Sequence, residues 1–421
     1  MNWSRRRLLQ AGLALPALIS AQARASEHGR VVIVGGGFAG ATAARYLRRW
    51  APAVDVTLVL GRRPYWTCPF SNLALVGGFR LAQLQVSRAA LAAEGINVVA
   101  AQAERFDPEK RRLWLDDDRV LEWDRLVLAP GVELMPDAIE GHDWAATRQF
   151  PHAWQAGPQT ALLSARLHAV PDDGLVIISV PEAPYRCPPG PYERASLMAW
   201  WLARHRPSAR VVVLDANAGF TKDGLFLQDW RQHHGDRLQW LGRGDSGALR
   251  RVDRRRGSVH TDFDDWQPDL ACVIPPQRAA AIARQADLDA GTGWCPVDPR
   301  TFASRVHPRV HVLGDAAIAS PMPKSAFAAA SQARVCAAAI SAAFSGQDAP
   351  EAVLMNTCYS LLSPERGISI TGTYRATGAA IEAVPGTTGI SPAAMADDVL
   401  AAEARHARGW YQRARAEAFG D

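Results

Sequence analysis

Apolar positions along the chain follow either the spacing of a strand or the spacing of a helix. The first clear change from a strand pattern to a helical pattern begins at residue 30. A β-branched run over 30–34 leads directly into Gly35-Gly36-Gly37-Phe38-Ala39-Gly40. An alanine-rich helical stretch over 41–50 comes next, and a second strand pattern occupies 55–60. Strand, G-x-G-x-x-G, helix and strand within about thirty residues predict a dinucleotide-binding unit.

The glycines of this loop have separate predicted roles. Gly35 permits the tight turn, Gly37 allows a pyrophosphate to approach the backbone, and Gly40 allows the helix to pack on the strand. The pyrophosphate would lie at the helix N-terminus, where free N–H groups and the helix dipole favour an anion. Leu60 stands where an acidic residue would bind the ribose hydroxyls. Either another group binds the ribose, or part of the protein's affinity for the nucleotide comes from some other contact.

Two later strand patterns end in residues suited to a nucleotide. Residues 125–128 run into Ala129-Pro130-Gly131, and residues 310–313 run into Gly314-Asp315-Ala316. Asp315, at a strand end before a helix, is well placed to hold a polyol such as the ribityl chain of a flavin.

A second strand series, at 175–180 and 210–214, lacks a glycine loop. Its first strand is followed by Pro181-Glu182-Ala183-Pro184. NADH would need close backbone approach at that turn, so the usual second nucleotide site is not expected.

The segment from 347 onward is predicted to be a separate unit. It mixes short apolar runs with turn signals and ends in a helical pattern over 392–419. The predicted turns are at Pro364, Gly367, Gly372 and Pro385-Gly386. The charge runs at 116–118 and 254–256 are expected to be solvated hairpin tips.

The first 25 residues differ from the rest of the 421-residue chain, whose 48% hydrophobic and 21% charged content is ordinary for a globular protein. Ser4-Arg5-Arg6-Arg7 precedes an apolar run over 8–20 that is too short to span a membrane, and Ala23-Arg24-Ala25 forms a cleavage pattern. We interpret residues 1–25 as a twin-arginine signal peptide for export to the periplasm; the alternative is an N-terminal helix of a cytosolic protein. Without its four arginines the formal charge falls from +5 to +1, which gives no reason to expect nucleic-acid binding.

Six cysteines are present, and none forms a CxxC, a zinc-type pair or a CxxCH haem site. We expect no metal, and any haem would belong to another chain. Cys272 and Cys336 lie in apolar or alanine-rich runs and are expected in the core, which is also favoured for Cys295. Cys187 and Cys358 stand in what look like polar loops, as a redox pair or as two separate buried thiols. From the residues alone, Cys68 could serve packing, a disulfide or a covalent bond to another group.

Several motifs stand in one order along the chain. They are GGGFAG (35–40), YWTC (65–68), APG (129–131), RCPPGPYER (186–194), GWCPVD (293–298), GDA (314–316), MPKS (322–325) and NTCYS (356–360). Together, from residue 29 to residue 420, they resemble the flavoprotein subunit of flavocytochrome c sulfide dehydrogenase, a relative of sulfide:quinone reductases.

The resemblance implies an α/β, glutathione-reductase-like fold with two dinucleotide-binding-type domains and a C-terminal α+β domain. An FAD-binding domain would comprise 26–140 and 270–346, a central NADH-domain-like domain 141–269, and the C-terminal domain 347–421. FAD would be bound covalently, through its 8α carbon, to Cys68. The Pro69-Phe70 that follows departs from the family pattern, as does Leu60.

The resemblance also implies a redox disulfide between Cys187 and Cys358 against the flavin. Glu193 is a candidate acid/base or a structural carboxylate. Lys324 and Ser325, at a helix start, could place positive potential near the flavin N1–C2=O edge.

The implied function is oxidation of hydrosulfide to sulfur or polysulfide, with electrons passed to a c-type cytochrome subunit in a heterodimer. One alternative is a sulfide:quinone reductase, but the helical pattern over 399–419 is highly charged and makes a poor membrane-insertion surface. The other alternative is a non-catalytic flavoprotein that assists a sulfur-oxidising partner.

Overall fold

The computed structural model describes residues 29–378, 380–392 and 395–421, so the predicted signal peptide lies outside the described residues. The chain starts with β1 (Arg30–Val34), α1 (Phe38–Trp50) and β2 (Asp55–Leu60), as the sequence predicts. β1 pairs in parallel with β2, and α1 carries its alanines inward. The dinucleotide-binding unit is therefore present at the beginning of the described chain.

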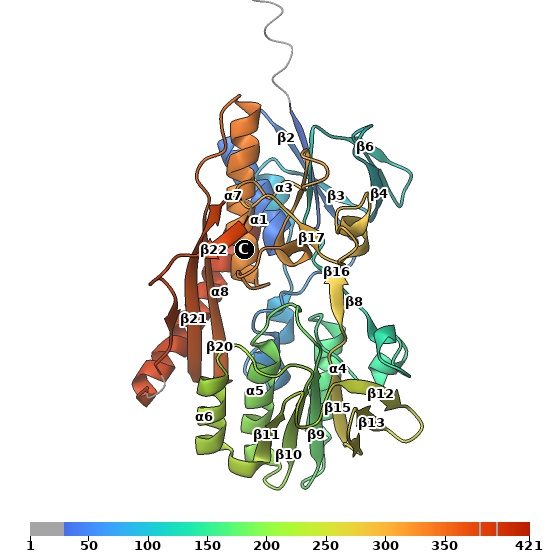
Figure 1. Ribbon diagram of the computed structural model, residues 1–421, viewed down its shortest axis with the longest axis vertical. Helices are drawn as coiled ribbons and strands as arrows, with labels where there is room; N and C mark the ends of the chain where they lie inside the picture. The colour runs from blue at the N-terminus through green and yellow to red at the C-terminus, as the bar shows by residue number, and fades with distance from the viewer. Residues whose placement is uncertain (1–28, 379, 393–394) are drawn as a thin grey trace, which may run out of the picture.

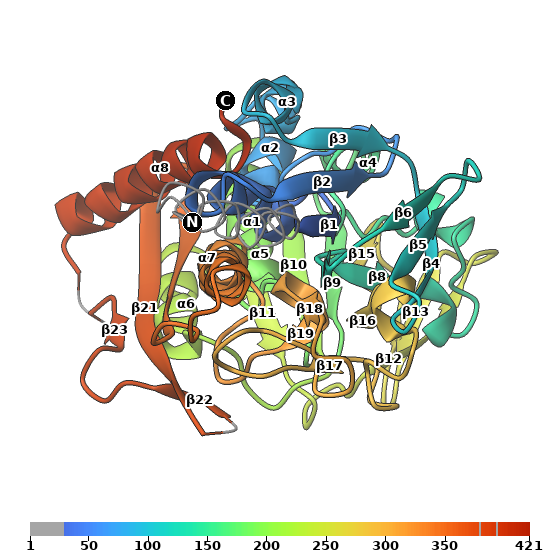
Figure 2. The same ribbon diagram turned by 90° about the horizontal axis from the view of Figure 1, so that it is seen from above.

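The first sheet is parallel and has the strand order β18-β7-β1-β2-β3. Its other strands are β3 (Asn97–Ala100), β7 (Arg125–Leu128) and β18 (Val310–Val312). β18 joins after the whole central part of the chain, so two separate segments build this sheet. The helices α1 and α7 (Ala326–Phe344) pack side by side over it (Figure 2).

Helix α7 is long, apolar and rich in alanine. Among the described helices, it alone is long and apolar enough to cross a membrane, judged by length and composition. Of its apolar window, 56% is buried inside the fold, where alanines pack against α1.

A second parallel sheet, with order β11-β10-β9-β15, forms the lower half of the molecule in Figure 1. Its strands are β9 (Leu175–Val180), β10 (Arg210–Asp215), β11 (Leu238–Leu241) and β15 (Leu270–Val273). At the glycine-free turn after β9, the side chain of Asn217 bonds both Ala183 N and Pro181 O, each at 3.0 Å. The ring of Tyr192 stacks on Phe220 at 3.6 Å nearby. At this turn the Asn217 side chain therefore makes hydrogen bonds to the backbone, in a connection that lacks glycine.

The third sheet runs along one side of the other two (Figure 1) and is antiparallel. It comprises β20 (Val353–Ser363), β21 (Arg366–Thr377), β22 (Ala380–Ala383) and β23 (Gly389–Ile390), and α8 (Asp397–Phe419) packs on it. The prediction of turns at Gly367 and Gly372 is wrong, because both lie inside β21. A Cβ on Gly367 would lie 3.0 Å from Ala404 N, so this glycine allows α8 to approach the strand.

Smaller elements complete the fold. The remaining α-helices are α2 (Ser71–Leu75), α3 (Ala89–Ala93), α4 (Pro158–His168), α5 (Gly190–His205) and α6 (Asp223–His233). One small sheet consists of β4 (Ala103–Asp107), β5 (Arg112–Leu115) and β6 (Val120–Glu122), and another consists of β12 (Leu249–Asp253), β13 (Ser258–Thr261) and β14 (Asp265–Trp266). Two further sheets have two strands each: β8 (Val132–Leu134) pairs with β16 (Gln277–Ala279), and β17 (Cys295–Pro296) pairs with β19 (Ala317–Ile318). The charge runs at 116–118 and 254–256 occupy exposed hairpin turns, which confirms that prediction.

Candidate functional site

The glycine loop between β1 and α1 leaves a cradle for a ligand. A Cβ on Gly35 would lie 2.2 Å from Ala129 O, and one on Gly40 would lie 1.8 Å from Gly35 O, so neither position admits a side chain. A Cβ on Gly37 would meet only the phenol end of Tyr65, at 3.4 Å. Gly37 is the N-cap of α1, and no side chain caps this helix end. Free N–H groups beside an open glycine fit a pyrophosphate.

Leu60 cannot bind a ribose hydroxyl. It is 2% exposed, and a Cβ built on Gly36 would lie 2.1 Å from its Cδ2 atom, so Leu60 packs directly over the loop. Arg62, just after it, forms ion pairs with Asp116 and Asp117 of the β5–β6 turn. The end of β2 therefore supplies apolar packing and cations where the usual nucleotide site has a carboxylate.

Asp315 and Lys324 form a second part of the cradle. Asp315 lies in the short turn after β18, and burial raises the pKa of its carboxyl, while the charges of Arg186 and Lys324 oppose the rise. The Lys324 ammonium donates to Asp315 O at 2.7 Å and Ala317 O at 2.9 Å, and lies 3.9 Å from the Trp294 ring centroid. Burial lowers the pKa of Lys324 to about 8. Lys324 thus stabilises the Asp315 turn, and its action on a flavin remains a prediction.

Gly131 follows β7 in the left-handed region, with φ at +74°, and nothing lies within 4 Å of a Cβ built there. The sequence placed this glycine among the cofactor-binding residues, and its open side is compatible with that assignment.

Cys68 lies on a tight turn before α2 and is half-buried. Its Sγ atom is 3.9 Å from Trp154 O, a carbonyl that also accepts a hydrogen bond from the Arg186 guanidinium. Burial alone would lower the pKa of the Arg186 guanidinium, but nearby negative charges, with that of a Cys68 thiolate first among them, raise it above its ordinary value. Cys68 is a free thiol and therefore available for a bond to another group.

Cys187 lies just before α5 with an unusual backbone conformation. Its φ is 58°, in the left-handed region, and its N–H donates to Lys324 O at 2.8 Å. A Cβ on Gly190 would lie 3.0 Å from Cys187 Sγ, so the glycine gives the sulfur its space. Burial raises the pKa of the Cys187 thiol, and the negative charges of Glu193 and of a Cys358 thiolate raise it further. Cys187 therefore lies within electrostatic reach of both groups.

Cys358 lies inside β20, so the prediction that it stands in a loop is wrong. The strand alternates, and Asn356, Cys358 and Ser360 share its buried face. Asn356 Nδ2 donates to Cys358 Sγ at 3.2 Å, while Asn356 Oδ1 accepts from Ser325 Oγ at 2.6 Å. Ser325 also caps α7, as expected for a residue at a helix start. Its hydroxyl links that helix to the cysteine strand, and its contact with a flavin stays a prediction.

Glu193 lies one turn inside α5, whereas Cys187 lies in the loop just before this helix. Its two carboxylate oxygens accept from Asn72 Nδ2 and from Leu361 N, each at 2.8 Å. Burial raises the pKa of Glu193, and these two hydrogen bonds oppose the rise. Glu193 thus connects α2, α5 and β20; its acid/base role remains a hypothesis.

Lys222 is a site residue that sequence reasoning missed. It is the N-cap of α6, is 5% exposed, and donates from Nζ to Ser360 Oγ at 2.7 Å and to Cys358 O at 3.2 Å. Burial lowers the pKa of Lys222 to about 8, against the opposing effect of the Cys358 and Glu193 charges. The chain has only three lysines among 47 basic residues, which is a signal that could have drawn attention to it.

The remaining cysteines are in the core, as predicted. Cys272, Cys295 and Cys336 are each 0% exposed. Cys272 has a polar contact that its apolar flanks do not reveal, since Arg194 Nη1 lies 3.0 Å from its sulfur. Among the described residues, no group of three or more His, Cys, Asp and Glu side chains is arranged to hold a metal ion.

The site thus brings Cys68, Cys187 and Cys358 together beside a dinucleotide cradle. The charges of the other two cysteines both act on Cys187, although the three residues come from different sheets and connections. Neighbouring thiols beside a cradle for a nucleotide suit sulfur redox chemistry.

Comparison with known proteins agrees with this arrangement. Residues 29–156 match the pyridine nucleotide-disulphide oxidoreductase family model. Residues 160–275 match the model for the central part of the sulfide dehydrogenase [flavocytochrome c] flavoprotein chain, and residues 350–419 match the flavin-binding model of flavocytochrome c sulphide dehydrogenase.

Individual relatives point the same way. The chain is 58% identical over 43 residues, 10% of its length and 90% of the relative's, to a sulfide dehydrogenase [flavocytochrome c] flavoprotein chain of Chlorobaculum thiosulfatiphilum. It is 21% identical over 329 residues, 73% of its length and 70% of the relative's, to the mitochondrial sulfide:quinone oxidoreductase of Mus musculus. The solved sulfide:quinone oxidoreductase of Aquifex aeolicus has the same fold, with a TM-score of 0.73, 15% identity and 92% of each chain covered.

The fold and the cradle define a flavoprotein of the pyridine nucleotide-disulphide oxidoreductase class. Within that class, the chain belongs to the family of flavocytochrome c sulfide dehydrogenase flavoprotein chains. It is an oxidoreductase of the sulfide dehydrogenase and sulfide:quinone reductase type, and its flavin is FAD.

Proposed function

We propose that this protein oxidises hydrosulfide through a Cys187–Cys358 disulfide and FAD, and passes the electrons to a c-type cytochrome. The observation that carries the proposal is the placement of both cysteines. Cys187 is anchored to the start of α7 through Lys324 O, and Cys358 is linked to the same helix start through Asn356 and Ser325. Cys187 and Cys358 therefore both lie at the start of α7, beside the residue that holds the Asp315 turn.

The chemistry begins with thiol–disulfide exchange. Hydrosulfide attacks one sulfur of the disulfide; a new S–S bond forms, the Cys187–Cys358 bond breaks, and one cysteine becomes a persulfide while the other leaves as a thiolate. This exchange conserves electrons, and the two electrons of sulfide oxidation leave afterwards through the cofactor. When bound, FAD supplies the conversion between two-electron sulfur chemistry and one-electron haem chemistry. Lys222 supplies positive charge behind Cys358 during the exchange.

The glycine loop and the Asp315 turn would hold FAD, and the Cys68 sulfur would tether it through its 8α carbon. The tether offers a reason why Leu60 is tolerated, since a covalently held nucleotide does not depend on a ribose-binding carboxylate. Removal of the sulfur in Cys68→Ala should then release the flavin during desalting.

The electron acceptor is a separate cytochrome subunit, because the sequence contains no CxxCH. The twin-arginine pattern before residue 26 suits export to the periplasm of a protein already folded around its cofactor.

The test uses purified protein mixed anaerobically with sulfide and either cytochrome c or a soluble quinone. Flavin bleaching with cytochrome reduction is the expected result. Quinone reduction alone would identify a sulfide:quinone reductase, and no reduction of either acceptor would identify a non-catalytic accessory flavoprotein.

A further inference from the structure

Tyr411 of α8 contacts the chain on both sides of Cys68. Its hydroxyl lies 2.6 Å from Thr67 Oγ1, and its ring stacks on Phe70 with the centroids 4.7 Å apart and the planes 29° from parallel. Tyr411 is 3% exposed and belongs to a helix more than 300 residues further along the chain. One side chain therefore holds the residue before Cys68 and the second residue after it.

The turn that Tyr411 contacts is strained. Phe70 has φ at 67°, a left-handed conformation that a bulky residue adopts only at a steric cost. Such a conformation persists only where the surroundings determine it. Ser71 helps from inside the turn, because its N–H and its hydroxyl both donate to Cys68 O, at 3.0 and 2.6 Å.

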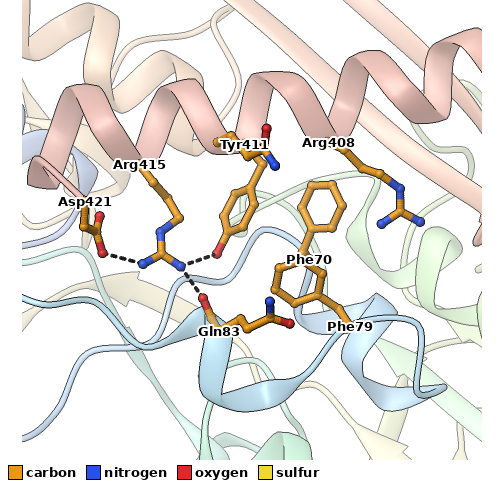
Figure 3. A pocket seen from close by; sticks show the side chains of 8 residues that line it. Phe70, Phe79, Gln83, Arg408, Tyr411, Arg415 and Asp421 are labelled. Carbon is orange, nitrogen blue, oxygen red and sulfur yellow. Dashed lines mark hydrogen bonds and ion pairs between the residues drawn. The ribbon is translucent and has the colours of Figure 1, made fainter.

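From outside the turn, aromatic rings hold Phe70. Besides Tyr411, Phe79 contacts it with a centroid distance of 5.6 Å. A pocket of about 320 Å³ opens beside these rings, between α8 and the segment 70–83 (Figure 3). The Tyr411 and Phe79 rings therefore pack on Phe70 beside this open space, with the Arg408 guanidinium 6.0 Å from the Phe70 ring centroid.

The sulfur of Cys68 lies 3.9 Å from Trp154 O and within electrostatic reach of Tyr65, the residue that faces Gly37 in the cradle. Thr67 and Phe70 thus contact Tyr411, while the thiol between them lies close to Tyr65 of the nucleotide cradle.

We propose that Tyr411 is a positioning residue for covalent attachment of the flavin at Cys68. This inference rests on the proposed tether and concerns only how the sulfur is directed to the 8α carbon. In the attachment, Cys68 loses its proton, its sulfur forms a bond to that carbon, and one C–H bond there breaks with loss of a proton. The electron pair released reduces the flavin by two electrons, and a c-type cytochrome or dioxygen takes them up afterwards.

The test follows attachment in the full-length chain produced under riboflavin limitation and then mixed with FAD. The readout is the share of bound flavin that stays with the polypeptide after acid precipitation, against time. Tyr411→Ala should slow attachment about tenfold or more at equal total FAD, because correct placement of reacting atoms dominates such rates. Tyr411→Phe and Thr67→Val, which remove the same hydrogen bond from its two sides, should each slow it by a smaller factor.

Tyr46→Phe is the matched control. It also removes a tyrosine hydroxyl that ties α8 to the first domain, through Glu417 at 2.8 Å, and it should attach flavin at the parental rate. If Tyr411→Ala does not fold, the two hydrogen-bond variants decide the outcome. Parental attachment rates in the Tyr411 and Thr67 variants, with none in Cys68→Ala, overturn the positioning role alone. A parent that never retains flavin after precipitation overturns the tether and the positioning role together.

Discussion

The N–H of Cys187 donates a 2.8 Å hydrogen bond to the carbonyl oxygen of Lys324. This contact joins the cysteine loop of the central sheet to the residue that holds the Asp315 turn of the first sheet. It also coincides with a left-handed backbone at Cys187, whose φ is 58°. The proposed reactive cysteine thus combines a strained backbone with a hydrogen bond between the connections of two sheets.

The backbone of Cys187 predicts an unusual order of variant stability. Cys187→Gly should be more stable than Cys187→Ala by about 1 kcal/mol, because glycine adopts a positive φ without steric cost. Urea unfolding of the two variants measures the difference. At Cys336, inside α7, the glycine variant should instead be less stable than the alanine variant. Equal stability of the two Cys187 variants would mean that the strain is absent.

The open side of Gly37 predicts a loss of cofactor without a loss of fold. In Gly37→Ala the new methyl group meets only Tyr65, at 3.4 Å, so the thermal midpoint of the flavin-free protein should stay near the parental value. FAD content should fall strongly, because the methyl group occupies the approach of the pyrophosphate.

Gly244→Ala, at a glycine with nothing within 4 Å of a built Cβ, is the control and should keep its flavin. If Gly37→Ala keeps its full FAD content, the nucleotide does not bind at this loop.

Lys222 predicts a pH-dependent stability. Its pKa is about 8 in the folded protein and 10.5 ordinarily, so below pH 8 both states carry the proton and the full cost of burying the ammonium is present. Between those values the unfolded chain holds more protons, and the parent gains stability with rising pH by at most about 1.4 kcal/mol per pH unit from this group. The stability of Lys222→Met relative to the parent should therefore fall from pH 8 to pH 10.

Chemical unfolding at several pH values checks this, with Lys110→Met as the control at an exposed lysine. A Lys222→Met difference that stays constant with pH contradicts the prediction.

Replacement of Glu193 should lower the stability of the fold, whether or not this residue transfers protons. Glu193→Gln replaces one acceptor oxygen with an NH₂ group, so either Leu361 N–H loses its acceptor or Asn72 Nδ2 keeps only its hydrogen bond to Gly190 O. A buried donor left without an acceptor costs about 1–3 kcal/mol. The thermal midpoint should fall accordingly, while Glu382→Gln on exposed β22 should leave it unchanged. An unchanged midpoint for Glu193→Gln would show that these bonds do not stabilise the fold.

Local patterns in the sequence predict much of the fold but only part of the site. The β1–α1–β2 unit follows from residues close together in the chain, so periodicity and glycine spacing identify it. Polar Asn356 and Thr357 before Cys358 indicate a loop, and only the packed sheet shows that Asn356 faces inward and donates to the sulfur of Cys358. Lys222 lies 136 residues from Cys358, and no local pattern indicates such a contact.

The central claim, that Cys187 and Cys358 pass electrons from sulfide to FAD, is tested most directly by anaerobic rapid mixing with sulfide while flavin absorbance is recorded. The parent and Cys336→Ser should bleach rapidly, whereas Cys187→Ser and Cys358→Ser, at equal FAD content, should not bleach on that time scale. Bleaching of Cys187→Ser at the parental rate would contradict the disulfide mechanism.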